Sequence, residues 1–201
     1  MLRLFIAVTL PEEALAACTL EARRIETALG AKLARGLRFP RGEGLHFTLK
    51  FLGATPEEQV GPLRAALEKA AAQVGRPFTL VLKGLQAFPS PRRPRVVYLA
   101  TGEGASSMKA LAAAVEESVS PLGFPSEARS FTPHVTLARV KDFKAAPRIG
   151  QRLAELPEVE VARFEVRDVA LMLSQLSPGG SRYSALARAS LAGDRLGDSA
   201  T

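Results

Sequence analysis

Two histidines are the residues of this chain best placed to do chemistry. The 201-residue sequence contains only His46 and His134, and each begins a four-residue segment of the form histidine, any residue, threonine, leucine. We call residues 46–49 the first His-x-Thr segment and residues 134–137 the second. Both lie in short β-prone runs, where successive side chains point to opposite faces. Each histidine therefore shares a strand face with the threonine two positions later.

Imidazole and hydroxyl groups in this arrangement suit displacement at phosphorus. One imidazole can accept a proton from the nucleophile while the other, protonated, gives a proton to the departing oxygen. The hydroxyls of Thr48 and Thr136 can donate hydrogen bonds to the non-bridging phosphate oxygens. The alternative is that both histidines are structural and inert. The duplicated pattern, with no third histidine, favours catalysis.

The sequence offers poor material for a metal site or a disulfide. Cys18 is the single cysteine, which rules out an internal disulfide and a cysteine-based zinc site. No carboxylates cluster beside the two imidazoles in the sequence. We therefore expect neither a metal nor another cofactor.

Composition favours a soluble protein with a polyanionic partner. The formal charge is +7, and 20 of the 27 cationic residues are arginine, which suits RNA. A bias in the genome or adaptation to heat would also give an arginine-rich protein. Charge alone does not distinguish these explanations from an RNA partner. Hydrophobic residues make up 47%, yet no apolar run approaches the ~20 residues of a membrane span. We expect a cytoplasmic monomer without membrane attachment.

The elements that must position the histidines follow a layout that occurs twice. A strand, a helix, a histidine-bearing strand and a helix come first, and after further strands the order helix, histidine-bearing strand, helix recurs. Region 159–176 is too long for one straight strand, so we expect it to bend. The pattern predicts an α+β fold with one domain over residues 1–191 and a frayed tail over 192–201. The predicted strands are 3–9, 45–52, 78–88, 95–101, 130–140, 159–176 and 181–191, and the helices 11–34, 56–74, 104–122 and 147–155.

The chain resembles the 2H phosphoesterase superfamily, in its bacterial and archaeal branch of RNA 2′,3′-cyclic phosphodiesterases, also called 2′-5′ RNA ligases. The paired His-x-Thr segments carry the resemblance. Further stretches that are similar to the family are RLFIAVTLP, LHFTLKFLG, FPSPRRPRVVYL, FTPHVTLARV and SQLSPGGSRYSALARASL. The resemblance implies a bilobal fold in which two antiparallel sheets face a central cleft, with helices on the outside and a pseudo-twofold repeat.

The resemblance also implies an activity and a site. It implies hydrolysis of an RNA or nucleoside 2′,3′-cyclic phosphate to a 2′-phosphate, without metal or ATP. His46 would be the proton donor to the leaving 3′ oxygen and His134 the proton acceptor, while Thr48, Thr136 and Arg139 would bind the phosphate. One alternative is 2′-5′ RNA ligation at the same site, and another is a non-catalytic module that binds nucleotides or RNA.

Strict strand alternation raises a difficulty for one of these residues. It places Arg139 on the face opposite His134, so either the strand bulges or the long side chain wraps around its end. The structural alternative is that Arg139 is a solvated charge at the end of the strand. Alternation places Lys50 on the face of His46 and Thr48, where it either adds positive field or lies on the rim.

Other residues have a structural and a functional interpretation. Tyr183 can pack in the core or reach the cleft, and we favour the core. Arg92, Arg93 and Arg95 lie in a stiff proline-rich turn. They either extend a track for RNA or simply keep the turn soluble.

Overall fold

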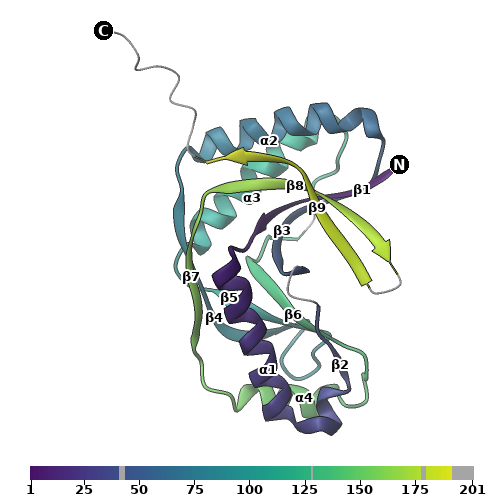
Figure 1. The fold of residues 1–201 in the computed structure, drawn as a ribbon, viewed down its shortest axis with the longest axis vertical. Helices are drawn as coiled ribbons and strands as arrows, with labels where there is room; N and C mark the ends of the chain where they lie inside the picture. Colours follow the sequence, from purple (N-terminus) through teal and green to yellow (C-terminus); the bar gives the residue numbers. More distant parts are fainter. Residues whose placement is uncertain (41–43, 128, 178–179, 192–201) are drawn as a thin grey trace.

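The computed structural model describes residues 1–40, 44–127, 129–177 and 180–191 (Figure 1). The tail expected over 192–201 lies outside the described residues. The described elements are β1 (Leu2–Thr9), α1 (Glu12–Ala34), β2 (Leu37–Arg38), β3 (His46–Thr55), η2 (Glu57–Gln59), α2 (Val60–Val74), β4 (Phe78–Phe88), β5 (Val96–Thr101), α3 (Ala105–Val119), η3 (Ser120–Leu122), β6 (His134–Val140), α4 (Ala146–Ala154), β7 (Glu160–Val166), β8 (Asp168–Ser177) and β9 (Gly180–Ser190). None of the helices in the described ranges has the length and apolar character needed to span a membrane.

Two antiparallel sheets form the centre of the molecule. Sheet A has the strand order β3-β1-β8-β9, and sheet B has the order β2-β6-β5-β4-β7. Helices α2 and α3 lie on the outside of sheet A, and α1 and α4 lie on the outside of sheet B (Figure 1). The predicted α+β fold, with two antiparallel sheets and outer helices, is confirmed.

The predicted repeat is visible in how the histidine strands are connected. β3 pairs with β1, the strand that precedes it across α1, and β6 pairs with β5, the strand that precedes it across α3. In both cases the connecting helix packs on the other sheet, α1 against β6 and β7, and α3 against β3. β3 and β6 are also in contact with each other. The exchange of helices therefore brings the two histidine strands together at the junction of the sheets.

The long predicted strand region changes sheets in its middle. β7 ends at Val166 after pairing with β4 of sheet B, and β8 begins at Asp168 and pairs with β1 and β9 of sheet A. The expected bend in 159–176 is confirmed. Its physical reason is that one chain segment pairs first with a strand of sheet B and then with strands of sheet A.

Both faces of sheet A are buried along β1. Leu4, Ile6 and Val8 belong to the main core, which lies between the sheets and their outer helices. The alternate residues Phe5 and Ala7 form a second apolar cluster on the other face, together with Ala170 and Met172. A strand that is buried on both sides needs apolar residues in succession, which explains the unbroken apolar run of β1. This second cluster supports the site described below.

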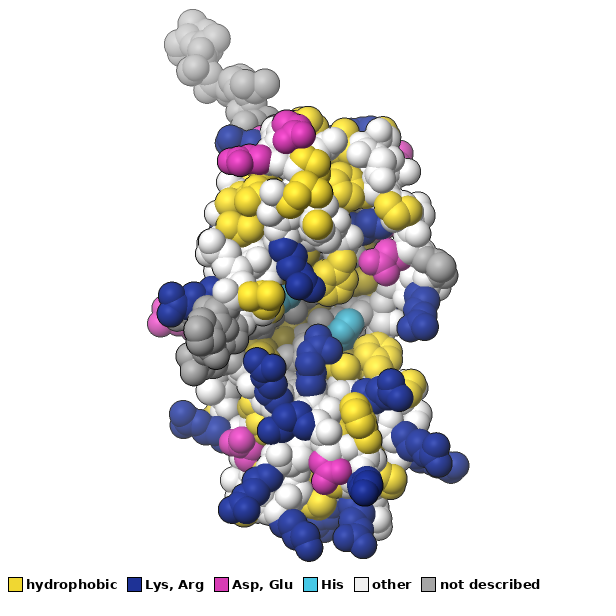
Figure 2. All heavy atoms as spheres, turned by 90° about the vertical axis from the view of Figure 1, so that its right-hand side faces the viewer, with side chains coloured by type: hydrophobic (Ala, Val, Ile, Leu, Met, Phe, Trp, Pro, Cys, Tyr) yellow, Lys and Arg dark blue, Asp and Glu magenta, His cyan; other side chains and the backbone are white. Residues whose placement is uncertain are grey.

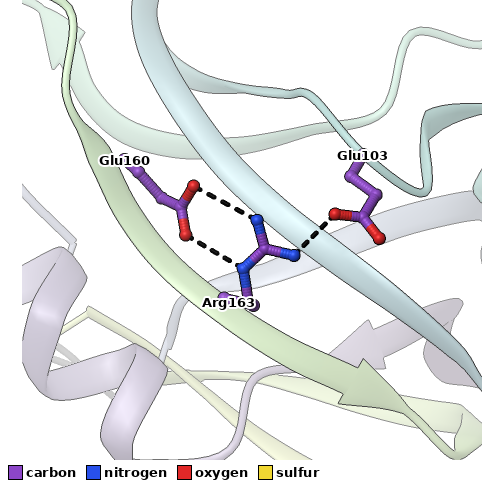
Figure 3. A network of polar contacts seen from close by, with 3 residues as sticks. All are labelled: Glu103, Glu160 and Arg163. Atoms are coloured by element: carbon purple, nitrogen blue, oxygen red, sulfur yellow. Dashed lines mark hydrogen bonds and ion pairs between the residues drawn. The ribbon is translucent and has the colours of Figure 1, made fainter.

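The outer edge of sheet B carries an exposed ion-pair network. Arg163, on β7, donates to both carboxylate oxygens of Glu160, at 3.1 and 3.4 Å, and to Glu103 at 2.5 Å (Figure 3). These side chains are about half exposed, so solvent screens their attraction. Charges on an edge strand oppose pairing with another chain, so this network fits edge protection.

Candidate active site

Both histidine strands contain a bulge at the same position. The pairing of β3 with β1 skips Leu49, and the pairing of β6 with β5 skips Leu137. Each leucine and the residue after it, Lys50 or Ala138, are buried in succession. A bulge adds one residue to a strand and so reverses the facing of every side chain beyond it. The face of each histidine therefore continues three residues after its threonine.

The bulge places Arg139 on the face of the second histidine. Along β6 the solvent-accessible residues are His134, Thr136 and Arg139, and the residues between them are buried. The charge of Arg139 also contributes to lowering the pKa of His134, so the two groups are within electrostatic range. Of the two ways in which Arg139 could reach the site, the structure shows the bulge.

The same bulge removes Lys50 from the face where alternation placed it. Lys50 is 2% exposed, and its Nζ donates to Glu116 Oε1 at 2.7 Å and to the Pro125 carbonyl at 2.5 Å. The expectation that it shares the face of the first histidine is wrong, because alternation fails across the bulge. Phe51, 66% exposed, takes the position that Arg139 has in the second segment. Through these two contacts Lys50 instead links β3 to α3 and to the loop before β6.

Aromatic rings surround His46. Its ring centroid lies 4.8 Å from that of Phe5 and 5.2 Å from that of Tyr183. Burial lowers the pKa of His46 to about 4, and the charge of His134 contributes, while a hydrogen bond to the Gly44 backbone works in the opposite direction. Tyr183, which was expected in the core, packs against the second apolar cluster and also contacts the histidine, so it lines the site.

The surroundings of His134 are of the same kind. Its ring lies 5.2 Å from Phe88 and 5.1 Å from Tyr98, which stack on each other at 4.3 Å. His134 Nδ1 lies 2.7 Å from the Thr132 carbonyl, which can only accept, so Nδ1 carries the proton and Nε2 has a free lone pair. Burial lowers the pKa of His134, and the charge of Arg139 lowers it further.

The two imidazoles belong to one site. The charge of His134 acts on the pKa of His46, although the histidines come from different sheets. Figure 2 shows histidine side chains in a hollow between the upper and lower halves of the molecule, with lysine and arginine side chains beside it. Thr48 and Thr136 lie half-buried on the same strand faces as the histidines. The two histidines therefore lie in one hollow, and Thr48, Thr136 and Arg139 lie on the histidine faces of the two contacting strands.

This set of groups suits a small anion. Hydroxyl and guanidinium groups donate hydrogen bonds, and two neutral imidazoles can each accept or, once protonated, donate one. Among the residues that the structure describes, no three side chains of histidine, cysteine, aspartate or glutamate gather as metal ligands would. A phosphate ester matches this arrangement, because its oxygens can accept the donated hydrogen bonds and can exchange a proton with an imidazole on either side of the phosphorus.

Sequence reasoning missed the aromatic lining of the site. Phe5, Phe88 and Tyr98 come from strands β1, β4 and β5, which carry no chemical pattern of their own. Their contact with the histidines depends on strand pairing, for instance of Tyr98 with Thr136. The repeated strand layout was the one available signal for this lining, because it predicts a partner strand beside each histidine strand. It does not predict the pairing register, so it does not show which residues contact the histidines.

Comparison with known proteins establishes the family of this chain. Residues 11–177 match the family model described as the 2′-5′ RNA ligase superfamily. That match covers most of the chain and includes both histidine strands. The chain belongs to the 2′-5′ RNA ligase superfamily, as the paired His-x-Thr segments predicted.

Relatives within the family share one name. An RNA 2′,3′-cyclic phosphodiesterase of Aeropyrum pernix is 37% identical over 145 residues, which cover 72% of this chain and 80% of that protein. An RNA 2′,3′-cyclic phosphodiesterase of Thermus thermophilus is 36% identical over 197 residues, 96% of this chain and 92% of that protein. The crystal structure of TT0787 of Thermus thermophilus superposes with a TM-score of 0.75 at 32% identity, covering 96% of this chain and 99% of the other.

Proposed function

We propose that this protein hydrolyses the 2′,3′-cyclic phosphate of RNA ends or nucleosides to a 2′-phosphate. The observation that carries the proposal is that the contacting strands β3 and β6 each present a histidine and a threonine on one face, with Arg139 on the face of the second histidine. The name shared by the relatives from Aeropyrum pernix and Thermus thermophilus supports the reaction class.

In this proposal His134 is the general base. Its Nδ1 proton is held by the Thr132 carbonyl, so the Nε2 lone pair is free to accept a proton from water. Burial and the charge of Arg139 lower the pKa of His134, which keeps the ring neutral near neutral pH. The water oxygen then attacks phosphorus in line with the bond to the 3′ oxygen.

His46 is the general acid that protonates the leaving 3′ oxygen. In the free protein its pKa of about 4 leaves it neutral. A bound phosphate anion favours the imidazolium, and the aromatic surroundings strengthen that attraction because they exclude water. The bond from water to phosphorus forms, the bond from phosphorus to the 3′ oxygen breaks, and the phosphate stays on the 2′ oxygen.

The phosphate itself is held by Thr48, Thr136 and Arg139. The two hydroxyls come from opposite sheets and donate to non-bridging oxygens, where negative charge increases during attack. The guanidinium of Arg139 adds a charge that does not titrate in the physiological range. No step requires a metal or a nucleotide cofactor.

Ligation is a second candidate at the same site, favoured by the name of the family model. A 5′-hydroxyl would replace water as the nucleophile, and the product would be a 2′-5′ linkage. Water is far more concentrated than RNA ends, which favours hydrolysis. A purely binding module has no need of two proton-transfer groups, so the paired imidazoles count against it.

The test is incubation with a 2′,3′-cyclic nucleotide and identification of the product. We expect a 2′-phosphate, whereas a 3′-phosphate would reverse the leaving-group assignment and no reaction would remove the proposed function. His46→Ala and His134→Ala should each lower turnover by at least about 100-fold, the usual contribution of a general acid or base. Arg64→Ala, on the exposed face of α2, is the control and should retain turnover.

A further inference from the structure

A second basic hollow lies at the far end of β6. It has a volume of about 350 Å³. The Arg95 guanidinium lies 5.4 Å from the ring centroid of Phe143, and Phe143 is 63% exposed. The lining residues are Arg93, Pro94, Arg95, Phe143, Ala146 and Pro147. We call this hollow the Phe143 cavity.

Strand β6 runs from the active site to the Phe143 cavity. That strand begins at His134 and ends at Val140, whose amide donates to the Arg95 carbonyl at 2.9 Å. At about 3.3 Å per strand residue, and with one residue taken up by the bulge, the cavity begins about 17 to 20 Å from the histidine. Arg139 lies between the two. The separation exceeds the length of one nucleotide, so a ligand that occupies both places is a chain.

The charge around the cavity suits an anion. None of the lining residues is acidic. Asp142 lies next to Phe143 in the chain, but its carboxylate accepts hydrogen bonds from the amides of Lys144 at 2.9 Å and Ala145 at 3.2 Å, and so caps its own loop. Lysine and arginine side chains also gather over the lower half of the face that holds the central hollow (Figure 2).

The turn that carries the two cavity arginines is held in place by a helix. It packs so closely on α4 that a Cβ atom at Gly150 would lie 1.8 Å from the Pro91 carbonyl oxygen. Pro94 also lies close to this glycine, and the Arg93 amide donates to the Ser90 carbonyl at 3.3 Å. A preformed cavity loses little conformational entropy when it binds a ligand.

We propose that the Phe143 cavity binds a nucleotide of single-stranded RNA on the 5′ side of the cyclic phosphate. The base packs on Phe143, and Arg93 and Arg95 pair with the backbone phosphates, since basic and aromatic side chains together are what single strands require. This inference rests on the proposed function and deepens it. It makes the preferred substrate an oligoribonucleotide ending in a 2′,3′-cyclic phosphate rather than a mononucleotide.

The first test compares substrates of different length. We expect kcat/KM to rise when the oligoribonucleotide, varied from two to about eight nucleotides, becomes long enough to reach the cavity. Phe143→Ala should lower the ratio of kcat/KM for the longest substrate to that for the mononucleotide by about 5- to 150-fold, the range for one base–aromatic contact. Phe143→Leu keeps an apolar side chain and should lower the ratio nearly as much, while Arg64→Ala should leave it unchanged. A ratio unaffected by Phe143→Ala overturns the inference.

The second test does not depend on catalysis. Binding of a fluorescent oligoribonucleotide that ends in a 3′-phosphate is measured by anisotropy for the wild type, Arg95→Ala and Phe143→Ala. Weaker binding by both variants supports the cavity even where no hydrolysis is found, in which case the proposed function alone fails. The inference is overturned if both variants bind the RNA as tightly as the wild type does. It is also overturned if a polyglutamate peptide displaces the RNA as effectively as unlabelled RNA does.

Discussion

The buried imidazole of His46 should make folding less stable in acid. Its ordinary pKa is 6.5, and in the folded protein burial lowers it to about 4. Between these two values the unfolded chain binds a proton that the folded protein does not. Protons therefore favour unfolding in this window, so the contribution of His46 is fully present above pH 6.5 and is lost as the pH falls toward 4.

The size of this effect follows from the same pKa values. The difference between 6.5 and about 4 corresponds to about 3 kcal/mol in the free energy of unfolding. At about pH 4.5 the folded protein is only partly protonated at His46, because this pH lies above its folded-state pKa. The wild type should therefore have lost about 2.5 kcal/mol of its free energy of unfolding through His46 at that pH.

Urea unfolding of the wild type and His46→Gln measures the effect. Glutamine does not titrate, so we expect the wild type to lose about 2.5 kcal/mol more than the variant between about pH 7.5 and about pH 4.5. Carboxylates titrate in both proteins and cancel in the comparison. His134→Gln should reduce the acid loss in the same direction, because the pKa of His134 is also lowered. An identical acid loss in the wild type and His46→Gln would refute the buried, neutral state of His46.

Three further predictions concern the proposed chemistry. Thr48→Val and Thr136→Val should each cost about 2–4 kcal/mol of transition-state stabilisation in kcat/KM, and full activity in either would remove that hydroxyl from the mechanism. Arg139→Gln removes a charge that lowers the pKa of His134, so that pKa should rise in NMR titrations. The limb of the pH–rate profile on the acidic side, which reports the general base, should move to higher pH with it, and Arg139→Lys should restore both values. An unchanged pKa of His134 in Arg139→Gln would mean that the arginine lies too far away. Activity should survive EDTA, and a loss that zinc or magnesium restores would contradict a mechanism without metal.

The positions of the histidines could be predicted because local pattern determines them. Alternation of apolar residues around His46 and His134 gives two strands with the imidazole and hydroxyl on one face. The order of helices and strands then limits the fold to a small set of arrangements. The length of region 159–176 was enough to predict its bend, since single strands of that length are unusual.

The bulges could not be predicted, because they depend on partners far away in the sequence. Lys50 has the pattern of a surface residue until Glu116, 66 residues later, supplies a carboxylate for its buried ammonium group. Without that partner a buried lysine would be costly, and alternation would be the better prediction. The position of Arg139 depends on the equivalent bulge in β6, and the contact of Tyr183 with His46 depends on the pairing of β9 within sheet A.

The central claim is that both imidazoles face one phosphate, and this chain allows a direct test because it has two histidines. NMR spectra of the ¹⁵N-labelled imidazoles, recorded during titration with a nucleoside 2′-phosphate, report each ring separately. We predict that the signals of His46 and His134 shift with the same dissociation constant and that the pKa of each rises, because one anion lies beside both. A response of one ring alone, with the other unchanged at saturation, would contradict it.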